Sequence, residues 1–256
     1  MDIDLELVME IAREAGAEVL AVYDGDFLVE TKDDRSPLTE ADRQSNAVIL
    51  RRLAEHYPGI PCISEETRTV PYEVRQDWEA CWLIDPLDGT KEFVKRNGEF
   101  TVNIALIRGR EAVCGVVYRP VEGTTYCGTV EGGSWRVDAD GSRHRLEGGG
   151  HYSGRERVTV VASRSHLTEE VKSFVAGLRE EGKEVEFISA GSSLKLCLVA
   201  EGRADVYPRF GPTMEWDTAA AHAVAAGAGR SVRAWPGGEP LHYNKQDLLN
   251  PWFIVE

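Results

Sequence analysis

The sequence has no run of 18 apolar residues, and its five cysteines form no CxxC pair. Without such a run we expect no transmembrane helix. Cysteines that are scattered and odd in number argue against a thiolate zinc site and favour a reducing, cytoplasmic compartment. The first residues, Met1 to Asp4, lack the basic region and apolar core of a secretory signal. These absences predict a cytoplasmic protein without membrane insertion.

Positive charge is also scarce, with 29 Lys and Arg residues against 43 Asp and Glu residues in 256 residues. The resulting net charge of −14 argues against nucleic acid or an anionic membrane as a partner, because both require a positive face. A phosphorylated small molecule is compatible with this charge if bound cations and a few local Lys or Arg residues offset the general field.

Apolar spacing predicts secondary structure along most of the chain. Helices are expected over 5–22 and 39–56, where residues 39–42 have the spacing of a capping box. The strands expected in the first half are 60–63, 101–107, 112–118, 124–130 and 134–137, with a hairpin turn at 108–110. In the second half, strands at 158–162, 185–188, 205–207 and 231–234 alternate with helices at 168–181, 192–201 and 216–226.

Residues 138–157 are rich in Gly, Asp, Arg and His and include three consecutive glycines, 148–150. We interpret this segment as an exposed loop or a domain boundary. Recurring helices and strands on both sides predict layered α and β structure in two subdomains, 1–150 and 151–256.

Residues 82–90, Trp-Leu-Ile-Asp-Pro-Leu-Asp-Gly-Thr, place two carboxylates beside a turn. The apolar run predicts a strand that stops at Asp85, Pro86 predicts a turn, and Asp88 follows. Residues 91–94 then begin a helix. Oxygen ligands suit Mg²⁺, and the exposed N–H groups at a helix start attract anions. This stretch therefore predicts a site for metal and phosphate.

Asp85 and Asp88 also have an ordinary explanation, because Asp is common at strand ends and Asp-Gly is a turn signal. The Pro-Leu spacer, however, fixes the turn and would point the Leu87 carbonyl between the two carboxylates. Phosphatases that form an aspartyl-phosphate use Asp-x-Asp-Gly-Thr, with the aspartates two positions apart. Here they are three apart, so metal-activated water attacking phosphorus in line fits better.

Other polar residues have local explanations of their own. Glu65 and Glu66 form an acidic turn after a strand, and Asp42 is the third residue of the capping box. Asp217 lies in a first helical turn, where an acid favours the helix dipole. His222 in an Ala-rich helix is more typical of a packed residue than of a ligand. A chemical role for the acids depends on their convergence on the central pair of aspartates.

Two segments resemble the signatures of the inositol monophosphatase superfamily of Mg²⁺-dependent, Li⁺-sensitive phosphatases: 82–90 and 215–220 (Glu-Trp-Asp-Thr-Ala-Ala). The continuation 91–106 is similar to one branch, the bacterial 3'(2'),5'-bisphosphate nucleotidases. Segments 191–195, 207–213 and 249–253 resemble the same branch. The resemblance runs nearly end to end and is weakest at 131–157. It implies an α+β fold, the layered α/β/α/β/α sandwich, with the site between the subdomains.

The resemblance also implies roles for individual residues. Asp42 and Thr90 would orient and deprotonate the attacking water. Two or three Mg²⁺ ions per site are implied, and in two-metal sites adjacent ions roughly 3.5–4 Å apart clamp the attacking and leaving oxygens. Without cations, carboxylates this close would repel one another and loosen the site. The implied metal ligands are Glu65, Asp85, the Leu87 carbonyl, Asp88 and Asp217.

Substrate contacts follow from the same resemblance. The scissile phosphate would lie against the backbone of residues 88–90, near the metal ligands Glu65, Leu87 and Asp217. A helix start with Gly and Ser amides plus a lysine suits a second phosphate and the adenosine. Lys195 and Arg209 are also compatible with surface charges at helix and strand ends. The residues implied to contact substrate, besides the metal ligands named above, are Gly89, Thr90, Gly191, Ser192, Ser193, Lys195 and Arg209.

The expected reaction is hydrolysis of 3'-phosphoadenosine 5'-phosphate to AMP and phosphate, with the sulfated nucleotide 3'-phosphoadenosine 5'-phosphosulfate as a further substrate. In the superfamily this reaction recycles a by-product of sulfate activation. An inositol monophosphate or sugar-phosphate phosphatase with the same metal core is the nearest alternative, and a non-catalytic nucleotide sensor is another. Both a monomer and a homodimer are compatible with the sequence.

Overall fold

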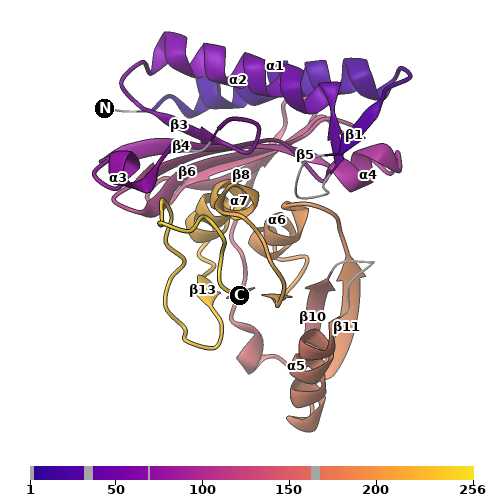
Figure 1. The fold of residues 1–256 in the computed structure, drawn as a ribbon. Helices are drawn as coiled ribbons and strands as arrows, with labels where there is room; N and C mark the ends of the chain where they lie inside the picture. Colours follow the sequence, from indigo (N-terminus) through magenta and orange to yellow (C-terminus); the bar gives the residue numbers. More distant parts are fainter. Residues whose placement is uncertain (1–2, 32–36, 69, 163–167) are drawn as a thin grey trace.

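The computed structural model describes residues 3–31, 37–68, 70–162 and 168–256, whose elements stack in five layers (Figure 1). Helices α1 (Leu5–Tyr23) and α2 (Glu40–His56) cover one face of a seven-stranded sheet. Helices α6 (Leu194–Ala200) and α7 (Glu215–Gly227) cover the other face, and small sheets followed by α5 (Glu169–Glu180) lie beyond them. The expected α+β, layered α/β/α/β/α sandwich is confirmed.

The large sheet has the order β3-β4-β5-β6-β7-β8-β9. Only the β3–β4 pair in this sheet is parallel, and the other pairs are antiparallel. Gly109 and Arg110 both have positive φ (55° and 72°), as expected for a tight hairpin turn, so the predicted hairpin is confirmed. The strands are β3 (Cys62–Ser64), β4 (Ala80–Asp88), β5 (Thr101–Arg108), β6 (Glu111–Arg119), β7 (Thr124–Thr129), β8 (Gly133–Val137) and β9 (Arg143–Leu146).

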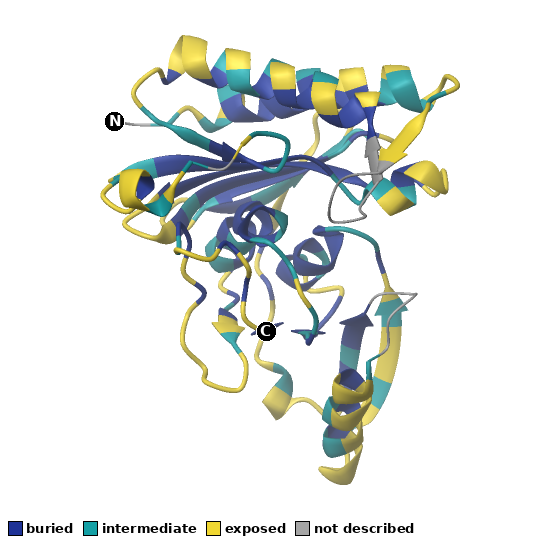
Figure 2. Cartoon of the chain, in the orientation of Figure 1, coloured by how far each residue is buried: buried dark blue, intermediate teal, exposed yellow. Residues whose placement is uncertain are grey.

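Strand β4 is buried on both faces, as Figure 2 shows for the centre of the sheet. Successive side chains of a strand point to opposite faces. Trp82 and Ile84 accordingly join the core beneath α1 and α2, whereas Cys81 and Leu83 join the core that includes α7. Apolar side chains on both faces fix the register of β4, and this places Asp85 at the end of the apolar run.

The remaining elements form smaller units. Strands β10 (Arg157–Ala162) and β11 (Glu184–Ser189) pair in parallel, and a parallel bridge joins Val160 to Val206. Strands β12 (Tyr207–Arg209), β14 (Phe253–Val255) and β13 (Val232–Ala234) form an antiparallel sheet. No helix among the described residues is long and apolar enough to cross a bilayer. Five short elements complete the fold: β1 (Val29–Thr31), β2 (Pro37–Thr39), α3 (Tyr72–Arg75), α4 (Thr90–Val94) and the 3₁₀ helix η1 (Tyr152–Gly154).

The interpretation of 138–157 as an exposed loop is wrong for part of the segment, which contains β9 and η1. Strand β9 pairs with β8 from Ser134–Leu146 to Val137–Arg143 and forms an edge of the large sheet. Its sequence lacks an apolar signature because only Leu146 of its four side chains is buried. The division into subdomains 1–150 and 151–256 stays a prediction.

Other differences are small shifts. The strand expected at 205–207 lies at β12, two residues later, whereas Val206 just before it forms the parallel bridge to Val160 of β10. The Asp205 carboxylate binds the Thr159 N–H and the Arg155 guanidinium, each at 2.7 Å. Helix α6 begins two residues later than expected. Elements β1, β2, α3 and β14, each three or four residues long, were not predicted.

Helix α7 lies so close to β6 that Gly115 has no room for a side chain. A Cβ built at Gly115 would lie 2.1 Å from the carbonyl oxygen of Ala220. We expect Gly115→Ala to lower the free energy of unfolding by about 1–3 kcal/mol, because the helix or the sheet must move. Urea denaturation checks this.

Gly177→Ala is the matched control, because Gly177 lies inside α5 with no atom within 4 Å of an added Cβ. This substitution should raise the free energy of unfolding by about 0.5–1 kcal/mol through helix propensity. Equal urea midpoints for Gly115→Ala and the wild type would contradict the close packing of α7.

Candidate metal and phosphate site

Three carboxylates from distant parts of the sequence meet at one end of β4. Because β3 and β4 pair in parallel with Ser64 opposite Ile84, Glu65 and Asp85 follow at the same level. The Glu65 N–H donates to the Ile84 carbonyl at 3.2 Å. Asp217 adds a third carboxylate from the first turn of α7, and one oxygen of each acid lies within 4.8 Å of the others. This spacing suits a cation between them.

A bulge in β4 lies between Asp85 and Asp88 and sets the direction of their side chains. The strand was expected to stop at Asp85, but it continues to Asp88 with a shift of its register against β5. Pro86 has no N–H for the ladder, so the chain leaves regular pairing there without ending the strand. The Ser45 hydroxyl donates to the Pro86 carbonyl at 2.7 Å, and Asp85 Oδ1 accepts from the Leu87 N–H at 3.1 Å. The expected turn is therefore a β-bulge that these two hydrogen bonds hold in place, and we call it the pinned bulge.

Asp88 is held by α6 and β5. Its Oδ2 accepts from the Ser193 N–H at 2.5 Å and from Asn103 Nδ2 at 3.3 Å. The Ser193 hydroxyl donates to Asn103 Oδ1 at 3.0 Å and lies 2.9 Å from Thr101 Oγ1. Asn103 and Thr101, both buried, were missed by the sequence reasoning. The signal available was a lone amide inside an apolar strand.

Asp42 and Thr90, the residues expected to handle the attacking water, lie side by side, and Asp42 also has a structural role. Asp42 Oδ2 accepts from the N–H and the hydroxyl of Thr39 at 2.8 and 2.7 Å, which completes the capping box of α2. Its Oδ1 accepts from the Thr90 hydroxyl at 3.4 Å, and the same hydroxyl lies 3.3 Å from the Leu87 carbonyl. These longer contacts are weak.

Burial and mutual repulsion make the acids retain protons. Burial, with the charge of Asp88 next, raises the pKa of Asp217 to about 8. Burial also raises the pKa of Asp88 to about 6, against the opposing effect of Lys195. The pKa of Asp85 is well above its usual range because of burial and the nearby charge of Glu65. A bound cation would release these protons.

A cavity of about 500 Å³ adjoins the acids and gathers most of the residues expected to contact substrate. Lys195 is buried in its wall, donates to the Ser192 carbonyl at 2.6 Å and lies over the Tyr207 ring. Burial lowers the pKa of Lys195 to about 8. The expected contacts that line the cavity are Asp88, Gly89, Gly191, Ser192, Ser193, Lys195, Arg209 and Asp217. Three other expected contacts, which the structure also describes, do not line it: Glu65, Leu87 and Thr90.

Buried polar contacts anchor α7 behind Asp217. Glu215, fully buried, accepts from the Asn244 N–H at 2.5 Å and from Lys245 Nζ at 2.5 Å. This residue was also missed, although it precedes Asp217 by only two positions. His222 Nδ1 lies 2.7 Å from the Tyr243 hydroxyl, and burial lowers its pKa to about 4. His222 is a packed helix residue, as expected.

Comparison with known proteins agrees with this geometry. The model of the inositol monophosphatase family matches residues 3–252. The chain is 47% identical to the 3'(2'),5'-bisphosphate nucleotidase CysQ of Escherichia coli K12 over 254 residues, 98% of each chain. The crystal structure of CysQ from Bacteroides thetaiotaomicron is similar with a TM-score of 0.86 and 44% identity, over 98% of this chain and 96% of that one. SuhB from Bartonella henselae shares the fold at 24% identity, with a TM-score of 0.77 over 98% of this chain and 92% of that one.

The raised pKa values predict how stability changes with pH in a chelator. The folded chain binds the Asp217 proton more tightly than the unfolded chain, whose Asp pKa is about 3.9. The stability gained from that proton is full below about pH 4 and is lost as pH rises to about 8. We therefore expect the Tm in chelator to fall between pH 5 and 8, and Mg²⁺ to raise it more at pH 8 than at pH 6.

Asp217→Asn should flatten this pH dependence, and Asp77→Asn, at an exposed site, should leave it unchanged. The measurement is thermal unfolding of the three proteins with and without Mg²⁺. A wild-type Tm that responds neither to pH nor to Mg²⁺ would show that the acids are not forced together.

Proposed function

The chain belongs to the inositol monophosphatase family, and we propose that it is a Mg²⁺-dependent, Li⁺-sensitive 3'(2'),5'-bisphosphate nucleotidase of the cytoplasm. One observation carries the proposal: three carboxylates within 4.8 Å stand beside a cavity that also contains Lys195 and Arg209. The first feature suits a metal-held phosphate, and the second suits another anionic group on the same molecule. The name of the E. coli relative, 47% identical over nearly its whole length, supports the same activity.

The donor set fits Mg²⁺, which prefers carboxylate, carbonyl and water oxygens. Glu65, Asp85 and Asp217 would hold one ion, and Asp88 with the Leu87 carbonyl would help to hold a second, which accounts for two of the two or three ions that the resemblance implies. When bound, the ions lower the pKa of a coordinated water and stabilise the charge on the phosphoryl oxygens. The raised pKa values of the acids support this role, because the buried carboxylates require positive charge nearby to be ionised together.

The proton of the attacking water would pass to the pair formed by Thr90 and Asp42. The Thr90 hydroxyl donates to Asp42 Oδ1 at 3.4 Å, so its lone pairs are free to accept from a water. Gly89, at φ 93°, allows the chain to turn from β4 into α4. The first amides of α4 have no intrahelical acceptor and would hold the scissile phosphate.

The second anionic group of the substrate would bind at Lys195 and Arg209, which line the same cavity. In 3'-phosphoadenosine 5'-phosphate that group is the 5'-phosphate, and hydrolysis of the 3'-phosphate would give AMP and phosphate. The sulfated nucleotide 3'-phosphoadenosine 5'-phosphosulfate has the same layout. An inositol or sugar monophosphate would use the acids in the same way without contacting either cation.

Phosphate release from 3'-phosphoadenosine 5'-phosphate and from inositol 1-phosphate, compared with Mg²⁺ and with added Li⁺, tests the proposal. We expect a strong preference for the nucleotide, inhibition by Li⁺, and a loss of at least 100-fold in kcat for Asp88→Asn, which removes charge where the phosphate reacts. Preference for the inositol ester would overturn the substrate assignment. Absence of turnover on both esters would favour a nucleotide sensor.

Arg209 offers a sharper test of the second anion. Its guanidinium lines the cavity, donates to the Pro212 carbonyl at 2.9 Å and also forms a hydrogen bond with the Tyr207 side chain. We expect Arg209→Gln to raise the KM for the bisphosphate about 10- to 100-fold, the value of a hydrogen bond to a charged group, and to leave inositol 1-phosphate hydrolysis unchanged. An equal loss on both substrates would indicate a structural role instead.

A further inference from the structure

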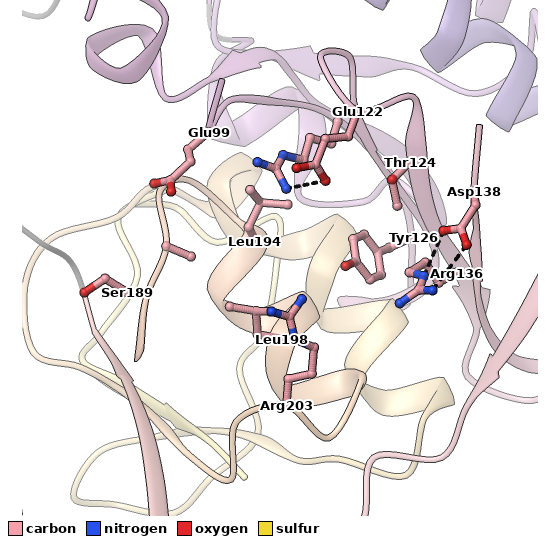
Figure 3. Close-up of a pocket in the computed structure, with 12 residues that line it drawn as sticks. Glu99, Glu122, Thr124, Tyr126, Arg136, Asp138, Ser189, Leu194, Leu198 and Arg203 are labelled. Carbon is pink, nitrogen blue, oxygen red and sulfur yellow. Dashed lines mark hydrogen bonds and ion pairs between the residues drawn. The ribbon is translucent and has the colours of Figure 1, made fainter. Parts of the chain in front are cut away.

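A second cavity, of about 290 Å³, is lined by the side chains drawn in Figure 3. Residues 189–194 separate the two spaces. Ala190 and Leu194 line the second cavity, whereas residues 191–193, between them in sequence, line the substrate cavity. The two cavities thus share one thin wall, and this wall contains the serine that holds Asp88.

The lining of the second cavity combines an apolar back with charged groups of both signs, and its carboxylates are those of Glu99, Glu122 and Asp138. Leu194, Leu198 and the Tyr126 side chain lie around its interior in Figure 3. Three guanidinium groups come from separate elements: Arg119 from the end of β6, Arg136 from β8, and Arg203 from just after α6. These three guanidinium groups offset the three carboxylates of the lining, in a chain whose net charge is −14.

The three arginines differ in how firmly they are held. Arg136 is locked by Asp138, at 2.9 and 3.2 Å, and by the mostly buried Glu201. Arg203 lies 3.7 Å from Glu201 and its side chain is 65% exposed. Its guanidinium reaches toward the cavity in Figure 3.

Arg119 can also bind a ligand anion at a small cost in free energy. Arg119 Nε donates to the Gly98 carbonyl at 3.3 Å, and its ion-pair partner Glu122, at 2.5 Å, has a side chain that is 53% exposed. An exposed ion pair of this kind contributes little, because water solvates the released carboxylate. A ligand anion can therefore replace Glu122 on Arg119 and also bind Arg203.

We propose that this cavity is a second ligand site, which binds a compact organic anion and transmits its occupancy to Asp88. The anionic group contacts Arg119 and Arg203, and the apolar body packs on Leu194 and Leu198. Ligand clefts usually measure about 300–1,000 Å³, so a volume of about 290 Å³ favours a small molecule.

Tight packing of the shared wall provides the transmission. Leu194 follows Ser193, whose N–H and hydroxyl hold Asp88 and Asn103. Ser192 has a positive φ of 44°, which is unfavourable for a residue with a side chain. A Cβ at Gly191 would lie 2.7 Å from the carbonyl oxygen of Glu99, so this wall cannot shift at one position alone. Displacement of Leu194 by a ligand therefore moves Ser193 and, with it, the Asp88 carboxylate.

Backbone amide shifts in ¹⁵N-labelled, Mg²⁺-loaded protein test the site with three probes. Benzenesulfonate has both the charge and the apolar body, inorganic sulfate has the charge alone, and benzenesulfonamide has the body alone. We expect benzenesulfonate to bind most tightly and to shift the amides of Leu194 and Leu198 before those of Gly89 and Thr90. Shifts confined to Gly89 and Thr90, or equal affinity for all three probes, would overturn the proposal.

Arg203→Gln should weaken benzenesulfonate binding about tenfold or more. Arg179→Gln, at an exposed position of α5 that lines neither cavity, is the matched control and should bind like the wild type. If both variants bind like the wild type, the site is wrong.

The transmission is tested by turnover, and this arm alone rests on the proposed function. Benzenesulfonate should change kcat or the Mg²⁺ concentration for half-maximal activity at least twofold in the wild type and in Arg179→Gln. The change should be lost in Arg203→Gln, whose basal activity should equal that of the wild type. Binding without any change in turnover would overturn the coupling. The amide shifts can be measured without turnover, so they show whether the second site binds its ligand even if the chain has no nucleotidase activity.

Discussion

Carboxylates that share a water-poor space repel one another, and the structure around Asp85 is arranged to hold them there. Parallel pairing of β3 with β4 sets Glu65 beside Asp85, and the pinned bulge at Pro86 turns the strand without ending it. The N-terminal turn of α7 supplies Asp217, where the helix dipole favours a negative charge. Apolar side chains on both faces of β4 resist the relaxation that repulsion would otherwise cause. Repulsion that cannot be relieved by movement is relieved by protons or by cations.

The Asp88 carboxylate connects this acid cluster to the rest of the molecule. One of its oxygens accepts from β5 through Asn103 and from the start of α6 through Ser193. A change in the position of α6 therefore acts on the Asp88 carboxylate, and a change in that carboxylate acts on α6. The segment between the two cavities belongs to both, because Ser189, Ala190 and Leu194 line one cavity and residues 191–193 line the other.

Features that depend on neighbouring residues could be predicted from the sequence, and features that depend on pairing could not. Apolar periodicity identified the long helices and the central strands, and the capping box at Thr39 was recognised from two residues. Strand β9 was not predicted from the sequence, because three of its four side chains face solvent and give no apolar pattern. Proline predicts a departure from the ladder, but a turn and a bulge begin with the same missing N–H.

The same limit applies to the candidate site. The convergence of Glu65, Asp85 and Asp217 depends on parallel pairing and on the placement of α7, and neither is visible in residue spacing; only the resemblance to a family indicated it. Asn103 has a partner on another element, so its contact with Asp88 was hidden as well.

The place of α7 in the chain bears on the order in which the protein assembles. Strands β4 to β9 are neighbours both in sequence and in the sheet, so their pairing closes short loops. Helix α7 packs on β6 from far along the chain, and it emerges late during synthesis. Asp217 therefore joins Glu65 and Asp85 only after most of the sheet exists. During synthesis the three carboxylates therefore come together only when the sheet that holds them in place has already formed.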